Sequence, residues 1–182
     1  MDTKIKSCLL TILLTSINCS ATAINNSGTI HFNGKVVDGT CNITFKSNGS
    51  GNSNNGTVDL KTMTTNDLFS QPVNFSLTPN KNCASTFTSS KAKINWTGSD
   101  LNSQGLKNIA KNDAAKHIYI QLTPINSQTN TPITSGHRIS LFKPSKNNNI
   151  SYNYTVQMKA DGKATVTPGM VQSNATYTVV YN

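Results

Sequence analysis

The stretch Gly28-Thr-Ile-His-Phe-Asn-Gly-Lys-Val36 alternates between glycine or apolar residues and polar ones. Gly28, Ile30, Phe32, Gly34 and Val36 share one face of an extended segment, and the polar residues share the other. Because successive side chains of a β-strand point to opposite faces, this period of two predicts an amphipathic strand over residues 29–37.

A second alternating segment ends the chain. Residues 171–181 have one face formed by Val171, Ser173, Ala175, Tyr177, Val179 and Tyr181. A strand with no strand after it leaves a backbone edge and a row of side chains uncovered. The amphipathic strand of the opposite terminus could fill that gap in a neighbouring copy. Such head-to-tail addition does not close on itself, so it would generate a filament.

The residues between these two ends predict an all-β sandwich. Turn pairs such as Asn33-Gly34, Asp38-Gly39 and Asp161-Gly162 separate short β-rich runs. Further strands are expected over residues 41–45, 57–60, 73–77, 92–97, 118–123, 138–142, 152–160, 163–166 and 175–181. Residues 47–55 indicate a flexible loop and residues 106–116 a short helical turn. Trp96 is expected in the core rather than at a sugar-binding surface.

The N-terminus has the features of a secretory signal peptide. Lys4 and Lys6 precede an apolar run over residues 7–17, and Ala21-Thr-Ala23 follows it. The run is shorter than the ~20 residues that a membrane-spanning helix needs. We therefore expect a signal peptide over residues 1–23, an N-terminal extension over 24–37 and one domain over 38–182. No membrane-spanning segment is expected in the mature chain.

Two cysteines, Cys41 and Cys83, remain after removal of that signal. An oxidising export route favours one intrachain disulfide between them. A metal site or a catalytic thiol is the less favoured alternative, since neither cysteine belongs to a C-x-x-C pair.

Charge and motifs argue against enzymes and nucleic-acid-binding proteins. The net charge is +9, but the lysines are scattered singly, and an exported chain does not meet nucleic acid. The sequence has no G-x-S-x-G motif, no paired carboxylates and no metal-binding histidine spacing. We expect no catalytic residues, no metal and no cofactor.

Residues 28–41 and 164–182 resemble the two ends of type 1 fimbrial major pilins, which are subunits of chaperone–usher pili. Tyr181 falls on their penultimate tyrosine and Gly169 on their glycine fourteenth from the end. The resemblance implies an incomplete immunoglobulin-like β-sandwich that lacks its final strand and is completed by donor-strand exchange. Gly34 falls where the family has a donor-strand glycine.

The resemblance also implies a mechanism and partners. A periplasmic chaperone would lend a strand to the open groove, and an outer-membrane usher would replace it with the extension of another copy or a related pilin. The subunit would travel through the periplasm to a surface fimbria that mediates bacterial adhesion. The implied donor residues are Gly28, Ile30, Phe32, Gly34 and Val36. The implied groove and chaperone-binding residues are Gly169, Val171, Ala175, Tyr177, Val179, Tyr181 and Asn182, the last through its carboxylate.

Two other functions fit the same sequence. One is a minor pilin or adaptor of equal size. The other is a freestanding exported β-sandwich that acts as a lectin-like adhesin. A freestanding module would be stable without a chaperone, whereas a pilin body without a donor strand would not.

Overall fold

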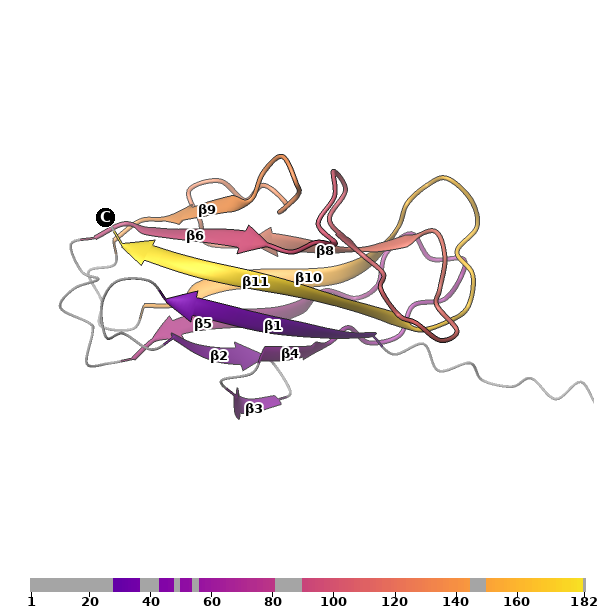
Figure 1. The fold of residues 1–182 in the computed structure, drawn as a ribbon, viewed down its shortest axis with the longest axis horizontal. Coiled ribbons are helices and arrows are strands. Elements are labelled where there is room, and N and C mark those ends of the chain that lie inside the picture. The colour runs from indigo at the N-terminus through magenta and orange to yellow at the C-terminus, as the bar shows by residue number, and fades with distance from the viewer. Residues whose placement is uncertain are drawn as a thin grey trace, which may run out of the picture.

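The computed structural model describes residues 28–36, 43–47, 50–53, 56–80, 90–144 and 150–181. The expected signal peptide, both cysteines of the expected disulfide, and Asn182 lie outside the described residues. Every regular element in the described part is a β-strand, and the strands form two layers (Figure 1).

The first sheet has five strands and contains both ends of the described chain. Its order is β4 (Gly56–Asp59), β1 (Gly28–Val36), β11 (Val171–Tyr181), β6 (Ala92–Thr97) and β9 (Ile139–Phe142). The second sheet has six strands. Its order is β3 (Ser50–Ser53), β2 (Ile43–Ser47), β5 (Val73–Pro79), β10 (Tyr152–Ala160), β8 (Ile118–Pro124) and β7 (Leu106–Lys107).

Aromatic side chains join the two sheets in the core. Trp96 of β6 is 1% exposed, and its ring lies 5.2 Å from that of Tyr154 on β10 and 5.5 Å from that of Tyr177 on β11. Tyr154 in turn stacks on Phe75 at 5.3 Å. These rings come from facing strands of both layers, as sandwich packing requires. The expectation that Trp96 belongs to the core is confirmed.

Most of the expected strands are confirmed, with shifts at their ends. β6 and β10 have the expected bounds, while β5 and β8 extend further than expected. The expected strand over residues 163–166 is wrong, because residues 161–170 form an irregular connection. That connection is held instead by Lys116, whose N–H donates to Thr167 Oγ1 at 2.9 Å.

The expected helical turn over residues 106–116 is also wrong. β7 occupies its start, and the rest follows an irregular course beside the beginning of β11. Asn108 fixes this course. Its Nδ2 donates to the carbonyls of Ala115 and Met170, and its Oδ1 accepts from the Gln172 N–H. These bonds replace the i to i+4 bonds that a helix would have made.

Two further expectations need correction. Residues 47–55 are not loop throughout, because β3 pairs with β2 inside them. The last strand, β11, has no free edge, because β1 of the same chain pairs along it (Figure 1). The amphipathic N-terminal segment therefore completes the sheet to which it is attached by sequence.

Candidate functional site: the groove between strands β4 and β11

The groove is the space in the first sheet that β1 occupies. β1 runs parallel to β11 and antiparallel to β4 (Figure 1). In the described part of the chain, β4 joins the first sheet only through β1. Without β1, the sheet would have a gap between β4 and β11, bordered by two unpaired strand edges.

One row of β11 side chains is buried beside β1. Val171, Ala175, Tyr177 and Val179 belong to this row, and the sequence predicted all four as groove residues. Ser173, which the alternation also placed in the row, is 0% exposed. The residues between them are only half-buried, so the expected alternation of β11 is confirmed.

The five predicted donor residues lie opposite this row in the register of β1. The pairs are Gly28 with Val171, Ile30 with Ser173, Phe32 with Ala175, Gly34 with Tyr177, and Val36 with Val179. In this register, the residues that the sequence places on one face of β1 stand opposite the buried row of β11.

The second wall of the groove was not anticipated. β4 contributes Val58, which is 0% exposed and pairs with Ile30. Gly56 pairs with Phe32, and a Cβ at Gly56 would lie 2.6 Å from the Phe45 ring. The sequence predicted this strand, but its neighbour across the sheet is set by long-range topology.

Gly169, which the resemblance placed among the groove residues, precedes the stretch of β11 that pairs with β1. It lies just before β11 with φ +150°, a conformation that favours glycine. A Cβ there would lie 2.2 Å from the Asp113 carbonyl oxygen and 2.5 Å from the Ala115 nitrogen. Gly169 thus allows two stretches of backbone to approach, where Met170 bonds with Asp113 and Ala115.

Tyr181 closes the other end of β11. Burial raises its pKa to about 12, and a hydrogen bond with Tyr152 partly opposes that rise. Burial, followed by the neighbouring Tyr181 phenol, also raises the pKa of Tyr152. Both phenols are therefore neutral at physiological pH and join the end of β11 to the beginning of β10 across the two sheets.

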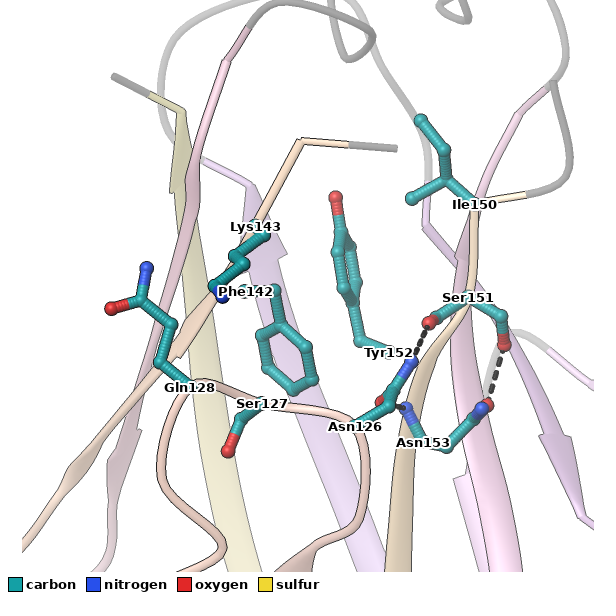
Figure 2. Close-up of a pocket in the computed structure, with 9 residues that line it drawn as sticks. All are labelled: Asn126, Ser127, Gln128, Phe142, Lys143, Ile150, Ser151, Tyr152 and Asn153. Carbon is teal, nitrogen blue, oxygen red and sulfur yellow. Dashed lines mark hydrogen bonds between the residues drawn. The ribbon is translucent and has the colours of Figure 1, made fainter. Parts of the chain in front are cut away.

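A pocket of about 360 Å³ lies near this same end of the sandwich (Figure 2). Its lining residues are Asn126, Ser127, Gln128, Phe142, Lys143, Ile150, Ser151, Tyr152 and Asn153. Its polar groups largely bond to one another. Asn126 Nδ2 donates to the Ser151 carbonyl at 2.8 Å, and Ser151 Oγ donates to Asn153 Oδ1 at 2.7 Å (Figure 2). These contacts hold loops together, so we assign no ligand to the pocket.

Within the described residues, no cluster of three or more histidine, cysteine or acidic side chains could hold a metal ion. In the same part of the chain, no helix has the length and apolar character to cross a bilayer. The groove is thus the feature that remains to be explained.

Comparison with known proteins shows the family to which the chain belongs. The sequence profile of a family described as fimbrial protein matches residues 30–182. The chain belongs to the fimbrial protein family. The K99 fimbrial protein of Escherichia coli is 31% identical over 97% of this chain and 99% of the relative.

Two solved structures resemble the fold of this fimbrial subunit. The P pilus rod subunit PapA matches 80% of this chain and 94% of its own, with a TM-score of 0.56 at 18% identity. A subunit of a chaperone–usher pilus, from a study of rod uncoiling, matches 96% of this chain and 100% of its own, with a TM-score of 0.53 at 17% identity. These likenesses confirm the expected fold, an all-β incomplete immunoglobulin-like sandwich.

Family membership settles the class of function. The chain is a fimbrial structural subunit, assembled into a surface pilus, and the expectation that it is not an enzyme is confirmed by the family.

Proposed function

We propose that this subunit polymerises by donor-strand exchange, in which β1 leaves its own groove and fills that of the next copy. The observation that carries the proposal is the register of β1. β1 occupies the gap between β4 and β11, and it pairs with β11 along nine residues. The same groove can accept the same strand from another chain.

The topology also supports a direction for the exchanged strand. We call the end of the sandwich where β11 begins at Val171 the start pole, and the end where β11 finishes at Tyr181 the end pole. β1 finishes opposite Val179, and β2 begins at Ile43, opposite Pro79, the last residue of β5. β5 finishes at the end pole, because Leu77 pairs with Tyr152, the neighbour of Tyr181. Each extension therefore departs from the end pole of its own body.

A donor strand that ran parallel to β11 would bring the donor's body to the end pole of the acceptor. The acceptor's own extension departs from that same pole, so the two would collide. An antiparallel donor strand brings the donor's body to the start pole and leaves the end pole free. We therefore infer that β1 reverses its direction when it moves from its own groove to that of a neighbour.

The remaining parts of the pathway follow from the resemblance to type 1 major pilins. We infer a signal peptide over residues 1–23, an extension over 24–37 and a pilin domain over 38–182. We also infer a Cys41–Cys83 disulfide, a periplasmic chaperone that holds the groove open, and an outer-membrane usher that exchanges the strands. The C-terminal carboxylate of Asn182 would be held by basic residues of the chaperone.

The test compares the intact chain with a variant that lacks residues 24–35. Each is exported with its chaperone and usher, and surface material is run unheated and heated on a denaturing gel. The intact chain should give an unheated ladder that collapses to monomer on heating. The truncated chain should bind chaperone and give no ladder. A ladder from the truncated chain would disprove donor-strand exchange.

Adjacent residues of β1 supply a matched control. Phe32 stands opposite buried Ala175, whereas His31 stands opposite Asn174, which is only half-buried. Phe32→Asp should therefore abolish the ladder, while His31→Asp should leave it intact. A stable intact monomer would be compatible with the proposal, because β1 can fill its own groove. A truncated monomer that is stable without chaperone would contradict the proposal.

A further inference from the structure

Three large apolar side chains are exposed on segments that meet at the start pole. Leu68 is 72% exposed, Phe69 60% and Met170 42%. Leu68 and Phe69 are the two most exposed large apolar residues in the described part of the chain. Single exposed apolar residues are normal, but adjacent ones that are so fully exposed indicate a contact surface.

Hydrogen bonds place these side chains around one end of the sandwich. Phe69 forms a bridge with Lys159, and the Ala160 N–H donates to the Leu68 carbonyl at 3.0 Å. Both contacts lie at the end of β10. Met170 immediately precedes β11, so it lies at the mouth of the groove. The Asp161 N–H donates to the His117 carbonyl at 2.9 Å, which links the end of β10 to the segment that pairs with Met170.

The backbone that carries Leu68 and Phe69 is fixed rather than loose. On one side, Asp67 Oδ2 accepts from the N–H and the hydroxyl of Thr64, both at 2.8 Å. On the other side, the Met158 N–H donates to Ser70 Oγ and the Ser70 N–H donates to the Met158 carbonyl, both at 2.9 Å. A segment whose backbone is ordered before binding loses less entropy when a partner docks.

A hollow adjoins the exposed pair. It measures about 380 Å³ and lies between residues 65–68 and the connection that follows β10, with Leu68 and Val166 in its lining. The start pole thus offers two protruding apolar side chains beside a recess, which is the shape that a complementary protein surface would fill.

We propose that Leu68, Phe69 and Met170 form a surface on which the body of the strand-donating copy docks. This inference rests on the proposed strand exchange and on its antiparallel direction, which brings the donor's body to the start pole. The surface is continuous with the mouth of the groove through Met170. The docked body would present its end pole, because its extension departs from there.

The test places a photoreactive phenylalanine analogue at position 69 in the full chain, exported with chaperone and usher. Irradiated fibres should yield crosslinked dimers, and mass spectrometry should map the crosslinks to the partner's end pole, at residues 125–128. The same analogue at Ile139, which is 37% exposed on β9, should not crosslink to that segment of a partner. The fibres could also form normally while position 69 crosslinks elsewhere or not at all. That result would disprove the proposed docking surface without contradicting strand exchange.

A double variant gives a second measurement. Leu68→Ser with Phe69→Ser changes exposed side chains only, so the subunit should fold and bind chaperone as before. Its ladder should collapse to monomer at a lower temperature than that of the unaltered chain. If the ladder of the double variant collapsed at the same temperature as that of the unaltered chain, the proposed docking surface would be contradicted. A chain without substitutions that gives no ladder at all would instead contradict strand exchange itself.

Discussion

The requirement for glycine at position 169 arises from close backbone packing rather than from a strand-binding pocket. The connection before β11 passes so near residues 113–115 that even a methyl group would meet carbonyl and amide atoms. These are backbone atoms, which cannot move aside as the end of a flexible side chain can. The packing orients Met170 and the first residues of β11, and so it helps to shape the start of the groove.

Gly169→Ala should therefore destabilise the subunit. Unfavourable φ alone costs about 1–3 kcal/mol, and the backbone clash adds to that. Gly136→Ala is the matched control, because a Cβ there would meet nothing within 4 Å. Urea unfolding of the purified monomers would measure both. Equal midpoints for the two variants would show that the connection can relax around a methyl group.

Two buried serines differ in their hydrogen bonding, so substitution by alanine should affect stability differently at each. Ser140 Oγ accepts a hydrogen bond from the Tyr154 hydroxyl at 3.0 Å, whereas Ser173 Oγ is buried without a hydrogen-bond partner among the described residues. Ser140→Ala should cost about 1–3 kcal/mol, since it removes a partner from a buried hydroxyl. Ser173→Ala should be neutral or stabilising by up to about 1 kcal/mol.

Unfolding free energies of the two alanine variants, measured under one condition, would test this contrast. A large loss of stability in Ser173→Ala would mean that its hydroxyl has a partner in solution.

At the scale of elements, β1 has two possible positions. In its own groove it makes parallel pairs with β11, which completes the monomer and occupies the surface that polymerisation needs. In a neighbour's groove it would run antiparallel. The first arrangement competes with the second, so the population of self-filled monomer would limit the supply of subunits for the fibre.

A disulfide should trap the self-filled form. Gly28 and Val171 are partners in the parallel register, so cysteines at both positions lie at a spacing that a disulfide can bridge. An antiparallel donor strand would hold residue 28 far from residue 171. The Gly28→Cys, Val171→Cys chain should therefore remain monomeric when oxidised and form a ladder once reduced.

Cysteines at Gly28 and Ser173 form the control, because they are out of register by two residues. The self-filled register would be contradicted if the Gly28→Cys, Val171→Cys chain kept both thiols free under oxidising conditions and still formed a ladder.

At the scale of the whole molecule, buried tyrosines hold the two sheets together. Burial raises the pKa of Tyr152, Tyr154, Tyr177 and Tyr181 above the ordinary value of 10.0. A phenol whose pKa is raised by folding favours the folded state while it is protonated. That contribution is complete below pH 10 and is lost as pH rises through the raised values.

The monomer should therefore keep its full stability up to about pH 10 and lose it steadily towards pH 12. Circular dichroism and tyrosine ultraviolet absorbance, followed together in an alkaline titration, would check this. Unfolding and ionisation of these phenols should coincide. Ionisation of all the tyrosines near pH 10 without loss of structure would show that the rings are accessible to solvent.

The sequence by itself determined the class of fold, most strands and the two segments that meet in the groove. Alternation with a period of two is a local property, and it identified β1, β6, β10 and the inward row of β11 directly. Burial of Trp96 followed from the usual burial of a lone tryptophan in a sandwich. The uncovered edge of the last strand connected the two alternating ends, and the family resemblance agreed with that connection.

Only the tertiary structure decided which strands became neighbours. It placed β1 in its own groove, made β4 the second wall, and moved Gly169 from the groove to the backbone contact at the start pole. It also replaced the expected helical turn by an irregular segment that Asn108 links to β11. The physical reason is shared: pairing partners and close backbone approaches depend on residues distant in sequence, which local patterns do not encode.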